Sequence, residues 1–145
     1  MFNAIYTSYD KVFIQRHGKC IEMKEKMNVI LEYLCLLSGT TFKGSIQASK
    51  KLLPKAKKVP IYLSSIDDYL IPLASCEKGD CLWIRARRYL TCYETDGRCY
   101  IKFKDRSVLE VIFSIFTIKM QYQKYWELEQ KREELLANSI MPFEV

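Results

Sequence analysis

Residues 89–104 constrain the fold of this chain more than any other segment. Two runs of alternating apolar and polar residues flank the pair Asp96-Gly97, and Asp-Gly between two such runs is a strong signal for a type I′ β-hairpin. With these two residues in the turn, Tyr93 pairs with Tyr100 across the hairpin. The sequence therefore predicts an antiparallel sheet in the second half of the chain.

This pairing predicts two different faces for the hairpin. The face expected on the core carries Leu90, Cys92, Cys99, Ile101 and Phe103. The opposite face carries Tyr93, Arg98, Tyr100, Lys102 and Lys104. Interleaved aromatic and basic groups are typical of nucleic-acid platforms, but a cross-strand tyrosine pair that only stabilises the hairpin explains them as well.

Weaker patterns predict the other strands. Alternation in the first two dozen residues suggests two or three short strands. Residues 59–63, 69–73 and 108–112 are further candidates, and Pro60 and Pro72 favour sheet edges or strand starts for the first two.

Two helices are predicted from caps and from apolar residues at helical spacing. Asn28 can cap a short helix in the N-terminal half, which Gly39 would end in the left-handed conformation. Ser114 can cap a long C-terminal helix. The resulting fold class is α+β: a mostly antiparallel sheet with a short N-terminal-half helix and a long C-terminal helix.

The length of the chain bounds its domain organisation. At 145 residues it suits a single domain over residues 1–145. We expect the charged end, residues 129–145, to project from that domain.

Positive charge is concentrated in one stretch of the chain. Residues 33–66 contain no acidic residue. Six lysines lie there: Lys43, Lys50, Lys51, Lys55, Lys57 and Lys58. Pro54 argues against a single helix through this stretch. A polyanion is the expected partner, although a merely solvated lysine face is the simpler alternative.

Two further segments could contact a phosphate or a base. Exposed amides and hydroxyls in residues 39–44, beside Lys43, could hold a phosphate, or the segment could be only a helix stop and a turn. Arg85, Arg87 and Arg88 could enter a narrow, A/T-rich minor groove. In a regular strand Arg85 and Arg87 share a face with Trp83, and they could equally serve solubility alone.

Enzyme signatures are absent from the sequence. It contains none of the common nucleotide-binding, hydrolase or zinc-protease motifs. The single histidine, His17, removes the commonest general base from most catalytic designs. The adjacent carboxylates Asp67-Asp68 suit a solvated turn. We therefore expect no enzyme activity, no metal and no cofactor.

The chain is expected in the cytoplasm, without a membrane partner. Its amino terminus lacks the features of a signal peptide. In a reducing compartment all six cysteines should be thiols, and we expect Trp83, bracketed by Cys81 and Ile84, to anchor the core.

One ordered set of motifs resembles the ComK family of competence transcription factors. The set comprises Cys35, Gly39-Thr-Thr-Phe42-Lys-Gly44, Lys58-Val-Pro60-Ile61, Pro72-Leu-Ala-Ser75 and Cys81-Leu-Trp83-Ile84. The resemblance covers about residues 25–128. One departure is Ser45-Ile46, where the family is expected to carry basic residues.

The resemblance implies a sequence-specific activator of DNA-uptake genes. Such a protein would bind paired A/T-rich boxes in double-stranded DNA, largely through the minor groove, and would bind as a dimer or higher multimer. RNA polymerase would be a partner, and an adaptor and a Clp protease would set the protein's level. Two alternatives stay open: a protein-binding regulator that kept the fold but lost DNA affinity, and an RNA-binding module.

Overall fold

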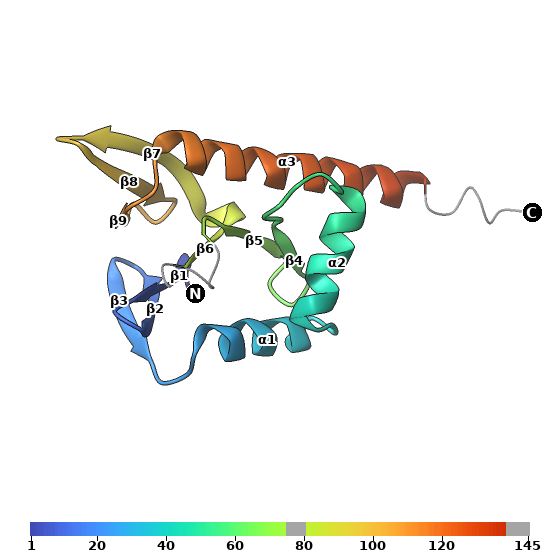
Figure 1. Ribbon diagram of the computed structural model, residues 1–145, viewed down its shortest axis with the longest axis horizontal. Helices are drawn as coiled ribbons and strands as arrows, with labels where there is room; N and C mark the ends of the chain where they lie inside the picture. Colours follow the sequence, from blue (N-terminus) through green and yellow to red (C-terminus); the bar gives the residue numbers. More distant parts are fainter. Residues whose placement is uncertain (75–80, 139–145) are drawn as a thin grey trace, which may run out of the picture.

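The computed structural model describes residues 1–74 and 81–138 and has the predicted α+β architecture. Its described part holds a six-stranded sheet, a three-stranded sheet and three α-helices. Figure 1 shows α3 along one side of the molecule, α1 along the opposite side, and α2 running between their ends.

The larger sheet is antiparallel throughout, with strand order β3-β2-β1-β6-β5-β4. Its strands are β1 (Ala4–Ser8), β2 (Lys11–Arg16), β3 (Lys19–Met23), β4 (Ile61–Leu63), β5 (Asp68–Pro72) and β6 (Leu82–Arg85). The prediction of two or three short strands in the first two dozen residues is therefore confirmed, with three strands present.

The two prolines have different places in this sheet. Pro60 directly precedes the edge strand β4, as expected. Pro72 instead ends β5, which is an interior strand, so the edge prediction is wrong there. An interior proline is tolerated because β4 pairs with β5 only as far as Leu70, so no β4 carbonyl lies opposite the missing N–H.

The smaller sheet contains the predicted hairpin. Its strands are β7 (Tyr89–Thr95), β8 (Arg98–Phe103) and β9 (Val108–Val111). Tyr93 pairs with Tyr100 as predicted, and Asp96 and Gly97 have φ of 53° and 76°. The core prediction is wrong for Leu90, which is 44% exposed, because a β-bulge between Tyr89 and Thr91 shifts the register at that residue.

The helices are α1 (Met27–Leu37), α2 (Phe42–Leu52) and α3 (Ile115–Asn138). The N-cap position of α1 is Lys26 and not Asn28, so that capping prediction is wrong. Gly39 follows α1 with φ of 82°, and the Ser114 hydroxyl accepts a hydrogen bond from the Thr117 amide at 3.1 Å, as expected for the start of α3. Helix α2 was not among the predicted elements.

The larger sheet is covered on both faces. One hydrophobic cluster joins it to α3 and the smaller sheet, and a second joins it to α1. Along β5, Tyr69 and Ile71 lie in the first cluster and Leu70 lies in the second. All five residues of β5 are consequently buried.

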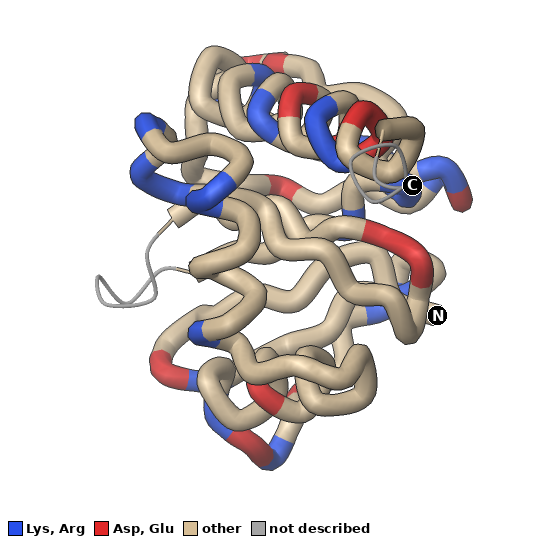
Figure 2. Tube along the Cα trace, turned by 90° about the vertical axis from the view of Figure 1, so that its right-hand side faces the viewer, with Lys and Arg blue, Asp and Glu red and all other residues tan. Residues whose placement is uncertain are grey.

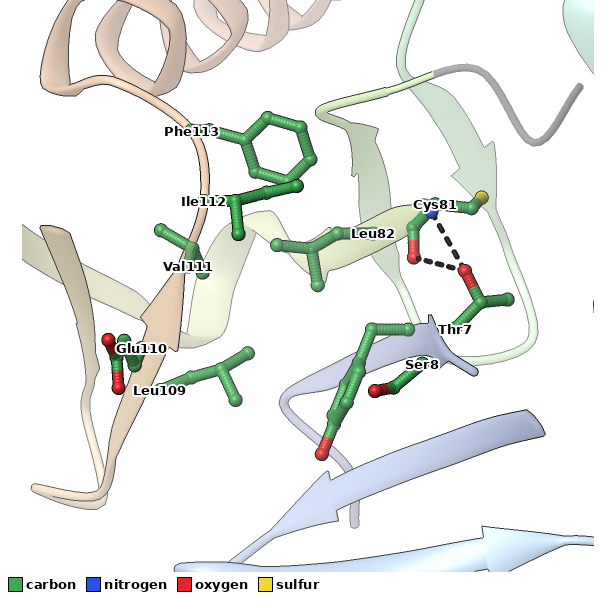
Figure 3. Close-up of a pocket in the computed structure, with 10 residues that line it drawn as sticks. Thr7, Ser8, Cys81, Leu82, Leu109, Glu110, Val111, Ile112 and Phe113 are labelled. Atoms are coloured by element: carbon green, nitrogen blue, oxygen red, sulfur yellow. Dashed lines mark hydrogen bonds between the residues drawn. The ribbon is translucent and has the colours of Figure 1, made fainter. Parts of the chain in front are cut away.

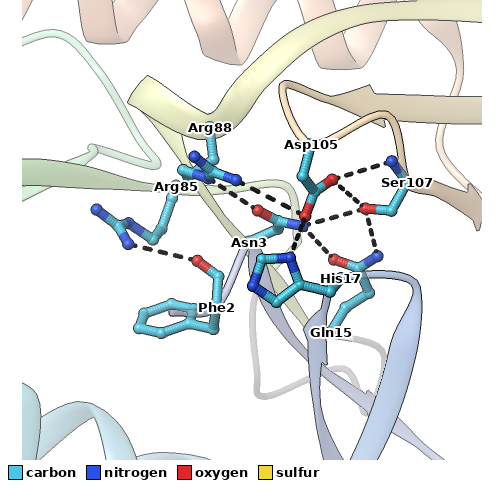
Figure 4. Close-up of polar contacts among 8 residues, drawn as sticks. All are labelled: Phe2, Asn3, Gln15, His17, Arg85, Arg88, Asp105 and Ser107. Carbon is cyan, nitrogen blue, oxygen red and sulfur yellow. Dashed lines mark hydrogen bonds and ion pairs between the residues drawn. The ribbon is translucent and has the colours of Figure 1, made fainter.

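A polar network ties the two sheets together (Figure 4). The Asn3 side chain donates hydrogen bonds to the Gln15 and Asp105 side chains, both at 2.8 Å. Asp105 also accepts hydrogen bonds from the amide and hydroxyl of Ser107, and Arg88 and His17 face its carboxylate at 3.7 Å. Burial opposes ionisation of Asp105, but the bonds from Asn3 and Ser107 and the charge of Arg88 outweigh it and lower its pKa to about 2.

Replacing Trp83 by Ala should lower the free energy of unfolding by about 3–5 kcal/mol. Trp83 lies in the α1-side cluster, is only 4% exposed, and meets Phe42 edge to face with 5.8 Å between ring centroids. Denaturant unfolding measures the loss. The half-exposed Trp126 is the matched control and should lose clearly less when replaced by Ala. An unchanged stability of the Trp83 variant would show that this indole does not anchor the core.

The Asp105 network should also make stability depend on pH. The pKa of Asp105 is lower in the folded state than the ordinary value near 3.9. Its ionised form therefore contributes stability above about pH 4, of about 2 kcal/mol, and that contribution is lost as pH falls toward 2. The difference in unfolding free energy between wild type and Asp105→Asn should shrink over this range. A difference that stays constant from pH 5 to pH 2 would refute this role of the carboxylate.

Candidate nucleic-acid interface

The six lysines predicted as a basic face lie on α2 and on the turn that follows it. All six are exposed. We call residues 43–58 the basic segment. Lys43, Lys50 and Lys51 belong to α2, and the other three belong to the turn. In Figure 2 this turn lies at the upper left, with its lysine positions in blue and no acidic residue in it, beside the mixed charges of α3.

Helix α2 starts where the sequence suggested a turn. The Thr41 hydroxyl accepts a hydrogen bond from the Gly44 amide at 2.9 Å, and the Glu32 carboxylate accepts one from the Phe42 amide at 3.1 Å. A side-chain cap and a carboxylate both stabilise a helix N-terminus. These two amides are therefore engaged within the chain and are not open to a phosphate.

Small residues let the inner face of α2 pack closely. Ser45 and Ser49 are buried, and the Ser45 hydroxyl lies 3.6 Å from the sulfur of Cys35. Burial raises the pKa of the Cys35 thiol. Ile46 packs against both hydrophobic clusters. The departure Ser45-Ile46 thus lies on the inward side of α2 and removes no charge from its exposed side.

Glu32 lies at the start of the basic segment, where its carboxylate accepts the Phe42 amide. Among the residues that the structure describes, however, none of the six lysines forms an ion pair. Lys124 of α3 adjoins it, with its ammonium nitrogen 3.5 Å from the Lys58 carbonyl oxygen. Burial and then the charge of Lys58 lower the pKa of Lys124. Positive groups thus gather here with no ion-pair partner on the described lysines, as at sites that bind anions.

The three arginines expected at a minor groove all have partners within the chain. The Arg85 side chain is buried and pairs with buried Asp68 at 2.9 Å. Arg87 pairs with Asp67 at 2.8 Å and with Glu129 at 3.3 Å. Arg88 donates a hydrogen bond to Asn3 at 3.0 Å and faces Asp105.

The local backbone accounts for these pairings. A short 3₁₀ helix, η2 (Ala86–Arg88), interrupts the alternation that would have aligned Arg87 with Trp83. Asp68, expected in a solvated turn, is instead completely buried, so that expectation is wrong for this residue.

The hairpin face contains a tyrosine pair. The rings of Tyr93 and Tyr100 stack with 5.4 Å between centroids, and Arg98 pairs with Glu110 at 3.7 Å. Tyr93 is 38% exposed and Tyr100 is half-buried. The pair fits cross-strand stabilisation, and its partial exposure leaves the RNA-binding hypothesis open.

Four of the five cysteines that the structure describes follow the sequence prediction. Cys20, Cys35, Cys92 and Cys99 are free thiols. Cys81 is disulfide-bonded, so the prediction of six thiols is wrong at that position. Cys76 and Ser75 lie outside the described residues. Within residues 1–74 and 81–138 no cluster of three or more His, Cys, Asp or Glu side chains could hold a metal ion.

Two cavities lie away from the exposed lysines. Figure 3 shows one of about 180 Å³ between β1, β6 and the connection from β9 to α3, lined largely by apolar side chains such as Leu82, Val111 and Phe113. The other, of about 280 Å³, lies under α2 and is lined by small residues together with Tyr62 and Arg132. The Arg132 guanidinium stacks 3.7 Å from the centre of the Tyr62 ring.

The described fold thus presents one exposed lysine-rich helix and turn, which the sequence analysis had marked as the candidate contact for an anionic partner. A model of the ComK protein family matches residues 3–135. The chain belongs to the ComK family, a family of competence transcription factors. No curated protein and no solved structure is significantly similar to it.

None of the helices in the described part of the chain is both long enough and apolar enough to span a bilayer.

Breaking the buried pair of Asp68 and Arg85 should be costly. The carboxylate of Asp68 also accepts hydrogen bonds from the amides of Tyr69 and Arg87. Replacing Asp68 by Ala should lower the unfolding free energy by about 3–5 kcal/mol, because it leaves a buried guanidinium without its partner. The exposed Asp67, replaced by Ala, is the control and should lower the unfolding free energy far less, because solvent screens its ion pair with Arg87. Equal losses in the two variants would argue against this assignment.

Proposed function

We propose that this protein activates competence genes by binding double-stranded DNA through its basic segment. The observation that carries the proposal is the set of six exposed lysines, without acidic neighbours in sequence or ion pairs in the described structure, in a chain of the ComK family. Lysines that replace counterions along the phosphates supply affinity without reading bases.

The family resemblance supplies the finer parts of the proposal. The protein binds A/T-rich boxes through the minor groove, as a dimer or higher multimer, in the cytoplasm. It acts on RNA polymerase at the promoter, and an adaptor with a Clp protease controls its level. The proposal leaves Arg85, Arg87 and Arg88 out of the DNA contact, because each has a partner within the chain.

Affinity for DNA should fall steeply with salt. Each lysine that neutralises a phosphate contributes a slope of about 0.9 in the logarithm of the binding constant against the logarithm of salt concentration. Replacing Lys43, Lys50 and Lys51 by Ala should therefore reduce the slope by up to about 2.7. Fluorescence anisotropy with a labelled A/T-rich duplex at several salt concentrations measures it.

The matched control removes the same charge elsewhere. Lys19, Lys24 and Lys104 are exposed outside the basic segment, and their replacement by Ala should leave the slope nearly unchanged. An equal loss in both variants would mean that net charge alone drives binding. If the wild type binds no duplex near 100 mM salt, where non-specific binders still reach roughly 10⁻⁴–10⁻⁶ M, the activator proposal fails and a protein-binding regulator takes its place.

A further inference from the structure

The turn after α2 is fixed at both ends and exposed in the middle. We call residues 54–58 the lysine turn. At its start Leu53 is buried, and the Leu53 carbonyl accepts a hydrogen bond from the Ala56 amide at 3.1 Å. At its end Val59 is buried, and the Lys58 carbonyl accepts a hydrogen bond from the Gln121 side chain at 3.4 Å. Pro54 restricts the backbone between these anchors further.

Three cations project from this short, anchored stretch. Lys55, Lys57 and Lys58 are exposed, and only the half-buried Ala56 separates the first two. Lys124 lies at the base of the turn, against the Lys58 carbonyl. No carboxylate of the described residues pairs with the lysine turn. An anionic partner that approaches the turn would therefore meet several positive charges held close together.

Shape decides which groove this element can enter. A helix with its side chains is about 10–12 Å across, whereas the minor groove of B-DNA is about 6 Å wide. Helix α2 therefore cannot enter an undeformed minor groove, but extended lysine side chains that project from an exposed turn can. A/T-rich minor grooves are narrower still, and their enhanced negative potential attracts inserted basic side chains.

The three arginines that follow Trp83 are poor candidates for the same role. The guanidinium of Arg85 is buried, and those of Arg87 and Arg88 are held by carboxylates of the chain. To reach DNA they would have to break these ion pairs. The lysines of the turn have no such ties within the described structure.

We propose that the lysine turn enters the A/T-rich minor groove, while Lys43, Lys50 and Lys51 of α2 contact phosphates beside it. This inference rests on the proposed DNA-binding function and assigns the sequence preference to Lys55, Lys57 and Lys58. The two sets of three lysines thus have different roles, although they carry the same charge.

The test compares two variants that each remove three charges. In the turn variant Lys55, Lys57 and Lys58 become Ala, and in the helix variant Lys43, Lys50 and Lys51 become Ala. Affinities for A/T-rich and G/C-rich duplexes of equal length are measured at several salt concentrations, with and without netropsin as a minor-groove competitor. All six side chains are exposed, so matching melting temperatures should confirm that both variants fold.

Both variants should lose up to about 2.7 units of salt slope. Only the turn variant should bring the ratio of A/T-rich to G/C-rich affinity toward one, and its residual binding should resist netropsin. Lys57→Arg should keep or raise the ratio, since arginine also suits a narrow minor groove.

Two different results would overturn the inference. A turn variant that keeps the wild-type affinity ratio would show that the turn only positions the protein on the phosphates, with DNA binding itself intact. A wild type that binds neither duplex would remove the proposed function, and this inference with it.

Discussion

The buried pair of Asp68 and Arg85 is the constraint on which the centre of this molecule depends. Its nitrogen and oxygen lie 2.9 Å apart, and both side chains are almost completely removed from solvent. The Asp68 carboxylate also accepts hydrogen bonds from the backbone amides of Tyr69 and Arg87. One side chain thereby links β5 to β6 and sets the start of η2, from which the chain enters the hairpin. A buried charge is tolerated when all its partners are present, whereas a buried charge without a partner strongly lowers the free energy of unfolding.

Around this centre the two kinds of cation have separate positions. The three arginines at positions 85, 87 and 88 form ion pairs with carboxylates of the chain. These carboxylates belong to Asp67, Asp68, Asp105 and Glu129. The lysines of the basic segment face solvent. The planar fork of arginine suits partly buried carboxylates, and the strongly hydrated ammonium of lysine suits an exposed surface. The charge that stabilises the fold is thus distinct from the charge offered to a partner.

The presentation of the basic segment depends on how α2 is packed. The small side chains of Ser45 and Ser49 let the buried face of α2 pack closely against its neighbours. Ile46 contacts the hydrophobic clusters on both sides of the larger sheet. The helix is therefore held on one side and leaves its lysines outward on the other. The following turn is held to α3 through Gln121. Its lysines start from a fixed backbone, which reduces the conformational entropy lost on binding.

Sequence alone determined the features that depend on neighbouring residues. The Asp96-Gly97 hairpin and its register, the N-terminal strands, the left-handed Gly39, the Ser114 cap and the exposed, acid-free lysine stretch could all be predicted. Each follows from local backbone preference or from composition, and neither requires knowledge of the rest of the fold.

Only the tertiary structure decided the features that depend on distant partners. Helix α2 was missed because its exposed side is polar and its buried side consists largely of small residues. This sequence pattern is typical of a loop, and it forms a stable helix here because α3 and the sheet pack against it. Leu90 is exposed because of a β-bulge that the sequence did not predict. The N-cap residue of α1 is Lys26, whereas the sequence predicted Asn28. The arginines looked available because Asp68 and Arg85 lie 17 positions apart in the chain, and Asn3 and Arg88 lie 85 apart. Pairing across such separations depends on strand order, which no local pattern encodes.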